Sequence, residues 1–185
     1  MASAPAEAWA PPFAWPRAVG AGLSFRPIGD GDLPFLARLY ASTREDELAM
    51  VPWSAEEKAA FLESQFRLQH AHYQRHYEGA DWLVIICAGA PAGRLYLARW
   101  TREHRIVDIA FLPEHRRHGL GSAVLRDLMD EAAAAGKDLT IHVEKMNPAL
   151  RLYRRLGFAT SEDKGVYDLM RWRPPTPVDQ VKTAS

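Results

Sequence analysis

The pattern of apolar and polar positions divides the middle of the chain into short strands and amphipathic helices. Apolar runs rich in branched and aromatic residues predict strands at 23–28, 82–89, 93–100, 105–112, 138–144 and 165–172. Apolar residues at helical spacing predict helices at 32–42, 54–78, 119–135 and 147–156. Strands and helices therefore follow one another in a mixed order, which predicts a mixed α/β fold.

Turns and caps locate several of the boundaries. The tripeptide at 90–92 separates two predicted strands and indicates a hairpin, and a polar turn at 101–104 leads into a third antiparallel strand. Ser54 and Glu57 have the spacing of a helix capping box. Asp32 is the expected N-cap of the first helix, because a leucine and a proline follow it.

The two ends of the chain lack these periodicities. Residues 1–21 are rich in Ala and Pro, and residues 174–185 are Pro-rich and polar, so we expect two tails around one domain at 22–173. Docking of the first tail on the domain is an alternative, because that tail contains three large aromatic residues. These residues are Trp9, Phe13 and Trp15.

The composition describes one neutral domain. The 185 residues include 23 Lys and Arg against 23 Asp and Glu, so no field of one sign supports binding to nucleic acid or to an anionic membrane. We see no signal-peptide pattern and no apolar stretch long enough to span a bilayer. The single cysteine, Cys87, lies in a predicted buried strand and fits a reducing compartment. We therefore expect a cytoplasmic protein without nucleic-acid or membrane partners, and we leave a homodimer open.

Histidines on the second predicted helix raise the question of a metal site. His72 and His76 are four residues apart, and His70 is near them. The helix has no HExxH pattern and no neighbouring cysteines, which zinc sites of this kind need. We expect surface histidines and no metal.

A basic loop with two glycines precedes the third long helix. The stretch HRRHGLGSAVL places Arg116, Arg117 and His118 just before Gly119 and Gly121. The first amides of a helix lack intrahelical partners and lie at the positive end of its dipole, and glycine lets a phosphate approach the backbone. We expect a phosphate site here, although the same residues also fit a plain strand-to-helix turn with solvated arginines.

The same loop partly matches a dinucleotide-binding fingerprint, with Glu144 near the place of a ribose-binding acid. Three features count against this match. Val124 or a neighbour stands where the third small residue belongs, several loop residues separate the strand from Gly119, and the later elements do not continue a doubly wound sheet. A nucleotide-dependent oxidoreductase is therefore the weakest hypothesis.

A second landmark lies downstream, in the stretch VEKMNPALRLYRRLGF. Together with Arg116-x-x-Gly119-x-Gly121, it resembles the GNAT superfamily of acetyl-CoA-dependent N-acyltransferases. The family carries an R/Q-x-x-G-x-G/A loop and an N-x-x-A-x-x-x-Y-x-x-x-G-F segment, although the alanine here falls one place early. The likeness is clearest over 104–172, and the earlier elements fit the family order from residue 23.

The resemblance implies a mixed fold with a central, mostly antiparallel sheet flanked by helices, and acetyl-CoA as cosubstrate. The pantetheine arm would lie along the fourth strand, and the pyrophosphate would bind the amides that follow it, beside Arg116. Asn147 would help to hold the cofactor, and Tyr153 would protonate the leaving thiolate. The other implied cofactor residues are Ile109, Ala110, Phe111, Arg117, His118, Gly119, Leu120, Gly121 and Ser122.

A general base is required because an amine is mostly protonated at neutral pH and must lose a proton before it attacks a thioester. Some relatives have a glutamate five residues before the asparagine, and here His142 holds that place. A histidine packed in the sheet is the alternative, and Asp108, Glu144 and Glu45 are rival bases.

The acceptor cleft of the family lies beside the link between the first two helices. In this chain the link at 42–53 offers acidic Glu45, Asp46 and Glu47 and an apolar group of Met50, Val51 and Trp53. A solvated acidic turn is an equal alternative. We expect direct acetyl transfer to a primary amine of a small molecule, peptide or protein, with a non-catalytic CoA-binding or interaction module as the alternative.

Overall fold

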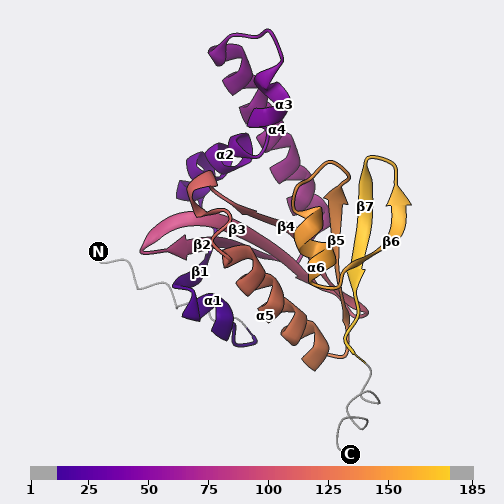
Figure 1. Cartoon of the computed structure of the whole chain (residues 1–185). Helices are drawn as coiled ribbons and strands as arrows, with labels where there is room; N and C mark the ends of the chain where they lie inside the picture. The colour runs from indigo at the N-terminus through magenta and orange to yellow at the C-terminus, as the bar shows by residue number, and fades with distance from the viewer. Residues whose placement is uncertain (1–11, 176–185) are drawn as a thin grey trace, which may run out of the picture.

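A computed structural model describes residues 12–175 of the chain. One seven-stranded sheet runs through the molecule in the order β1-β2-β3-β4-β5-β7-β6 (Figure 1). Only β4 and β5 pair in parallel, and all the other neighbouring strands pair antiparallel. The predicted fold, a mostly antiparallel sheet flanked by helices, is confirmed.

The strands are β1 (Leu23–Pro27), β2 (Asp81–Cys87), β3 (Ala90–Arg99), β4 (Glu103–Phe111), β5 (Asp138–Glu144), β6 (Ala159–Lys164) and β7 (Tyr167–Trp172). The α-helices are α1 (Pro16–Gly20), α2 (Leu33–Ser42), α3 (Glu45–Ala49), α4 (Ala55–His76), α5 (Leu120–Ala134) and α6 (Leu150–Arg155). Two short 3-10 turns, η1 (Asp30–Asp32) and η2 (Pro113–His115), precede α2 and α5. The sequence pattern missed α1, α3 and β6.

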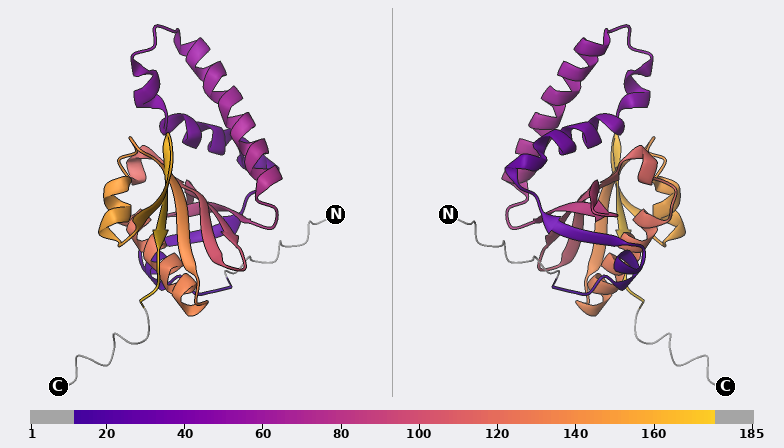
Figure 2. Two further views of the ribbon diagram at one scale, coloured as in Figure 1. Left: turned by 90° about the vertical axis from the view of Figure 1, so that its right-hand side faces the viewer. Right: turned by 90° about the vertical axis from the view of Figure 1, so that its left-hand side faces the viewer.

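The helices cover both faces of the sheet (Figure 2). On one face, α1, α5 and α6 enclose the larger apolar core, which includes Leu125 and Leu128 of α5. On the other face, α2 and α4 pack over a smaller core around Leu36 and Phe66. Figure 2 shows that α3 and the adjoining end of α4 project away from the sheet.

Two caps show how local chemistry sets helix starts. The predicted capping box is present at α4, where Ser54 Oγ accepts from the Glu57 amide at 3.2 Å and Glu57 Oε2 accepts from the Ser54 amide at 2.7 Å. Asp32 is the N-cap residue of α2, as predicted, although its side chain makes no capping hydrogen bond to this helix. Its carboxylate instead accepts from both terminal nitrogens of Arg26 at 2.7 Å and from the Gly29 amide at 2.8 Å.

The hairpin between β2 and β3 turns earlier than predicted. Ala88 and Gly89 form the turn with φ of 49° and 79°, and the tripeptide at 90–92 belongs to β3. Glycine accepts a positive φ without strain, which explains why the turn forms there. Gly93 meets the facing strand so closely that a Cβ would lie 2.4 Å from the Ala110 oxygen.

The predicted N-terminal tail over 1–21 differs from the structure at its inner end. Residues 16–20 form α1, and Trp15 is only 2 % exposed. Trp15 Nε1 donates to Glu131 Oε2 at 2.8 Å, and the Ala18 amide donates to Asp127 Oδ2 at 2.8 Å. These buried carboxylates of α5 therefore hold α1 on the domain, while Trp9 lies outside the described residues.

Candidate active site

The sheet opens between β4 and β5. These two strands pair only from Glu103 opposite Asp138 to Ile106 opposite Ile141, and pairing stops there. Beyond this point, residues 107–110 and 141–144 line the two sides of a cavity of about 170 Å³. Side chains of α2, α4, α6 and β7 complete its walls: Tyr40, Gln69, Tyr73, Tyr153 and Tyr167.

A β-bulge in β4 lies at the same point. Against β3, Tyr96 faces Asp108 and Leu97 faces Ile106, which leaves Val107 without a partner. A bulge bends a strand and shifts its alternation by one residue. Asp108 therefore shares a sheet face with Arg105 and Ala110 rather than with Ile106, and it lines the cavity.

Tyr153 lies where the family resemblance predicts the general acid. Its side chain lines the cavity from α6, is 4 % exposed and makes an edge contact with Phe158 at 5.6 Å between ring centroids. Burial, and after it the charge of Asp108, raise the pKa of Tyr153. The phenol therefore keeps its proton at neutral pH.

Asp108 faces the same cavity from β4. Its Oδ2 accepts from Arg94 Nη2 at 2.7 Å, and the same nitrogen donates to Gln69 Oε1 at 3.0 Å. Burial alone lowers the pKa of Arg94, but the neighbouring Asp108 more than reverses this effect and the pKa is raised. The arginine is 2 % exposed, so its ion pair with Asp108 is a buried part of the cavity wall.

His142, the predicted base, lies on β5 and also lines the cavity. Its Nδ1 is 3.1 Å from Arg105 Nη1. A guanidinium has only donors, so Nδ1 must accept and the imidazole proton lies on Nε2. Burial, followed by the charge of Arg105, lowers the pKa of His142. The ring is therefore neutral at pH 7 but has no free lone pair for an amine proton, which counts against the predicted role.

The other two rival bases lie in different settings. Glu144 lines the cavity but binds Arg44 through both oxygens, at 2.7 and 3.1 Å. Glu45 lies on α3 and lines a separate hollow between α2, α3 and α4. Of these acids, Asp108 and Glu144 therefore belong to the candidate active site and Glu45 does not.

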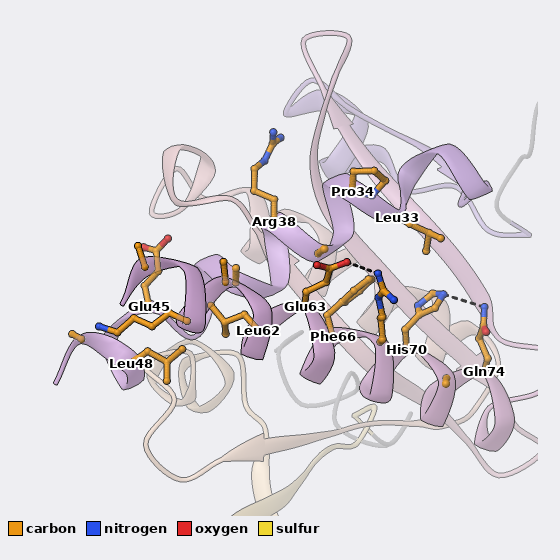
Figure 3. Close-up of a pocket in the computed structure, with 18 residues that line it drawn as sticks. Leu33, Pro34, Arg38, Glu45, Leu48, Leu62, Glu63, Phe66, His70 and Gln74 are labelled. Carbon is orange, nitrogen blue, oxygen red and sulfur yellow. Dashed lines mark hydrogen bonds and ion pairs between the residues drawn. The ribbon is translucent and has the colours of Figure 1, made fainter. Parts of the chain in front are cut away.

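The separate hollow is large and mostly apolar, with a volume of about 1110 Å³. Figure 3 shows Leu62 and Phe66 of α4 on one side of it and Leu33 and Pro34 of α2 nearby, with Glu45 at the far end. None of the six residues predicted to wall the acceptor cleft lines the polar cavity between β4 and β5. The neighbouring residues Thr43 and Arg44 line the polar cavity, whereas Met50 is 91 % exposed.

The predicted phosphate loop has the expected backbone. Arg117 and Gly119 have positive φ of 62° and 81°, and Gly119 is the N-cap of α5. No side chain caps this helix, and its first internal bond runs from the Ala123 amide to the Gly119 oxygen at 3.0 Å. The amides of residues 120–122 therefore have no partner within the helix, as a phosphate site requires.

Arg116 is hydrogen-bonded within the domain at the start of this loop. Its Nε donates to the Phe111 oxygen at 2.8 Å, and its Nη2 donates to Ser42 Oγ at 2.8 Å. The guanidinium thus ties the end of β4 to the end of α2. Arg117 and His118 are exposed beside the free amides, where their side-chain N–H groups can face an anion.

The remaining predicted cofactor residues surround the same opening. Ile109 and Ala110 line the cavity, and Phe111 ends β4 just before the loop. Because β4 has no pairing with β5 beyond Ile106, this edge of the strand is open to an extended ligand. Asn147 also lines the cavity, and its Oδ1 accepts from the Ala149 amide at 2.9 Å, so this side chain helps to start α6.

Residues 12–175 contain no group of three or more His, Cys, Asp or Glu side chains that could hold a metal ion. On α4, the rings of His72 and His76 stack at 4.0 Å, and His70 is hydrogen-bonded to Gln74. In the same described part of the chain, no helix has the length and apolar character needed to cross a membrane.

Residues 37–158 match the sequence model of the acetyltransferase (GNAT) family. The chain belongs to this family. The GNAT match covers the opening between β4 and β5, the glycine loop and Tyr153 together, so the family assignment and the geometry concern the same site.

Known proteins resemble this GNAT chain in parts. Streptothricin acetyltransferase of Streptomyces lavendulae is 33 % identical over 89 residues, which are 44 % of this chain and 47 % of that protein. The mouse cysteine-rich protein 2-binding protein is 42 % identical over 57 residues, which are 29 % of this chain but 7 % of that protein. The chain thus spans less than half of the length of these curated relatives.

A solved structure matches the fold over most of the chain. The PaiA N-acetyltransferase of Thermoplasma acidophilum, in complex with coenzyme A, has a TM-score of 0.61 at 15 % identity and covers 82 % of this chain and 98 % of its own. At this identity, the likeness establishes the fold alone.

Proposed function

We propose that the protein transfers the acetyl group of acetyl-CoA directly to a primary amine of a small molecule, peptide or protein. The observation that carries the proposal is the cavity between β4 and β5, which brings Tyr153 and Asp108 together beside an unpaired strand edge. This arrangement supports acid and base chemistry on a ligand that lies along β4.

Acetyl-CoA would supply the thioester that is cleaved. Its pyrophosphate fits the free amides of residues 120–122, beside Arg117 and His118, and its extended arm fits the edge of β4 at Ile109 and Ala110. A backbone amide on this edge can stabilise the oxyanion of the tetrahedral intermediate, an effect of about 3 kcal/mol per donor.

The chain's own groups account for the proton transfers. The amine nitrogen forms a bond to the thioester carbon and gives up a proton, and the carbon–sulfur bond then breaks. Tyr153 supplies the proton that the departing thiolate takes, since a phenol is protonated at neutral pH, and the tyrosinate regains a proton when Asp108 releases the one that it took from the amine. Asp108, directly or through water, takes the proton of the amine. Its Oδ2 is bound to Arg94 but its Oδ1 is left for the cavity, whereas His142 Nδ1 is occupied by Arg105.

Thiol release from acetyl-CoA with a panel of amines tests this function. Tyr153→Phe removes only the phenol oxygen, and we expect kcat to fall about 100-fold with the KM for acetyl-CoA nearly unchanged. Tyr77→Phe is the matched control, because its ring stacks on Trp100 outside the cavity.

Two results would contradict the proposal. Saturable CoA binding by calorimetry, without thiol release for any amine of the panel, would favour a non-catalytic CoA-binding module. The absence of CoA binding would overturn both readings of the site.

A further inference from the structure

Arg44 closes one end of the cavity with an ion pair to Glu144. Arg44 follows α2 and precedes α3, whereas Glu144 ends β5, so the pair joins the helical side of the cavity to the sheet. Arg44 Nη2 lies 2.7 Å from Glu144 Oε1 and Nη1 lies 3.1 Å from Oε2. Tyr167 supports the carboxylate with a hydroxyl donated at 3.3 Å.

The two ion pairs of the cavity differ in exposure. The side chains of Arg94 and Asp108 are 3 % and 15 % exposed, whereas those of Arg44 and Glu144 are 24 % and 25 % exposed. An ion pair that water reaches separates at lower cost than a fully buried pair. The outer pair is therefore the more exchangeable of the two.

The two partners of the outer pair are not equally free to move. Glu144 is fixed in a strand that pairs with β7 opposite Tyr167. Arg44 lies on a short link, and its long side chain has a second partner, Glu47, at 2.7 Å. When the pair separates, Arg44 still has Glu47 as a partner outside the cavity. Glu144 then lies in the cavity wall with a negative charge that has no arginine beside it.

We propose that Glu144 binds a second positive charge on the acceptor amine. Arg44 is bound to Glu144 in the absence of the acceptor, and the acceptor displaces the Arg44 guanidinium from this carboxylate. The inference rests on the proposed acetyl transfer and narrows its substrate class to linear amines with two cationic groups, such as diamines. An anionic acceptor fits less well, because Arg44 already has two carboxylate partners and Asp108 faces the same space.

The test compares α,ω-diaminoalkanes with ω-aminoalkanols of the same chain length as acetyl acceptors. Both series offer the same primary amine, and only the diamines carry the second charge. We expect kcat/KM for the best diamine to exceed that of its matched aminoalkanol by about 10- to 100-fold, the range for a hydrogen bond between charged groups.

Two variants locate the effect and change it in opposite directions. Glu144→Gln should remove the preference by lowering kcat/KM for diamines about 10-fold or more, with little change for aminoalkanols. Arg44→Met should lower the KM for diamines several-fold, because the internal competitor is gone. Glu162→Gln is the matched control, since Glu162 pairs with Lys164 on exposed β6.

Binding is measured beside turnover, by calorimetric titration of each diamine into the protein saturated with CoA. Equal acceptance of both series, or equal losses for both in Glu144→Gln, would overturn the inference while the proposed acetyl transfer stands. Absence of diamine binding would overturn it as well, with or without turnover. A variant that unfolds is recognised by its thermal unfolding, and the other variant then decides the question.

Discussion

At the scale of single residues, the cavity holds two candidate bases with different hydrogen bonds. The lone pair of His142 Nδ1 is taken by Arg105, whereas Asp108 binds Arg94 through Oδ2 and keeps Oδ1 for the cavity. Their conservative variants therefore have different expected effects on the reaction.

Asp108→Asn should lower kcat/KM about 100-fold, the usual contribution of a general base, whereas His142→Gln should lower it less than about 10-fold. The pH dependence of kcat/KM is the second measurement. The lowered pKa of His142 means that its protonation affects only the acidic side of the profile, below its ordinary value. A loss of that acidic limb in His142→Gln, with an active Asp108→Asn, would restore the histidine as base.

Asp108→Asn also weakens a buried ion pair with Arg94, and such losses cost about 3–5 kcal/mol when one partner is left unpaired. Thermal unfolding and CoA affinity of this variant therefore accompany its kinetics. An asparagine variant that binds CoA normally and still loses turnover assigns the loss to chemistry.

Sequence patterns identified Tyr153 and His142 but missed Arg44 and Arg94. Tyr153 lies within a motif of fixed spacing, so its place could be read directly. Arg94 carried a signal of its own, since a charged residue in a mostly apolar strand requires a buried partner. Arg44 carried none, because its partner is 100 residues away and the acids beside it suggested a solvated turn.

At the scale of elements, the start of α5 should depend on backbone shape as well as on charge. Gly119 and Gly136 lie at the two ends of this helix with positive φ of 81° and 64°, and a Cβ at either would meet nothing within 4 Å. Alanine at either position therefore adds backbone strain of the same kind, about 1 kcal/mol.

Gly119→Ala and Gly136→Ala should lower the free energy of unfolding by similar amounts, measured in urea. Only Gly119→Ala should weaken CoA binding, by about 10-fold in a calorimetric titration, because it alters the amides that face the pyrophosphate. Equal CoA affinities for the two variants would remove the phosphate site from the start of α5.

The elements that periodicity predicted well are those with a cap or a regular apolar period, such as α4, α5 and β5. Alternation could not predict the faces of β4. A strict period of two puts Asp108 on the face of Ile106, and the unpaired Val107 moves it to the cavity face. Periodicity also missed β6, whose residues are all exposed and carry no apolar signal.

At the scale of the whole molecule, α1 is part of the domain. Trp15 packs against Phe25 with ring centroids 4.7 Å apart and donates to buried Glu131. Trp15→Ala should destabilise the fold by about 3–5 kcal/mol, as expected for a buried tryptophan. Trp53→Ala is the matched control, since Trp53 is 42 % exposed, and it should cost less than about 1 kcal/mol.

Chemical denaturation measures both tryptophan variants. Equal stability of Trp15→Ala and the wild type would mean that α1 does not contribute to the fold. The contribution of α1 to the fold could not be predicted from the sequence. Its Ala- and Pro-rich composition is typical of a tail, and its partners lie more than 100 residues further along the chain.

Stability should also fall as the pH drops from 7 to 5. Burial lowers the pKa of His104, which is 3 % exposed and lies 3.8 Å from Glu131. The unfolded chain therefore binds this proton first, so stability is complete above the unfolded pKa of about 6.5 and is lost as the pH falls through the lower folded pKa.

His104→Gln should flatten the decline between pH 7 and 5, followed as the free energy of unfolding in urea. His118→Gln provides the comparison, because His118 is exposed on the loop before α5. An unchanged slope in His104→Gln would show that this proton is not linked to folding.

Because Val107 of β4 has no partner in β3, the number of residues in β4 determines which side chains face the cavity. If Val107 were deleted, every acid, base and arginine of the site would remain in the chain, but Asp108 would no longer lie on the opposite sheet face from Ile106. The proposed active site would then lose its arrangement through a change in spacing alone. Alignments of relatives should accordingly treat a gap at this one position as a functional difference, even where all the reactive side chains are kept.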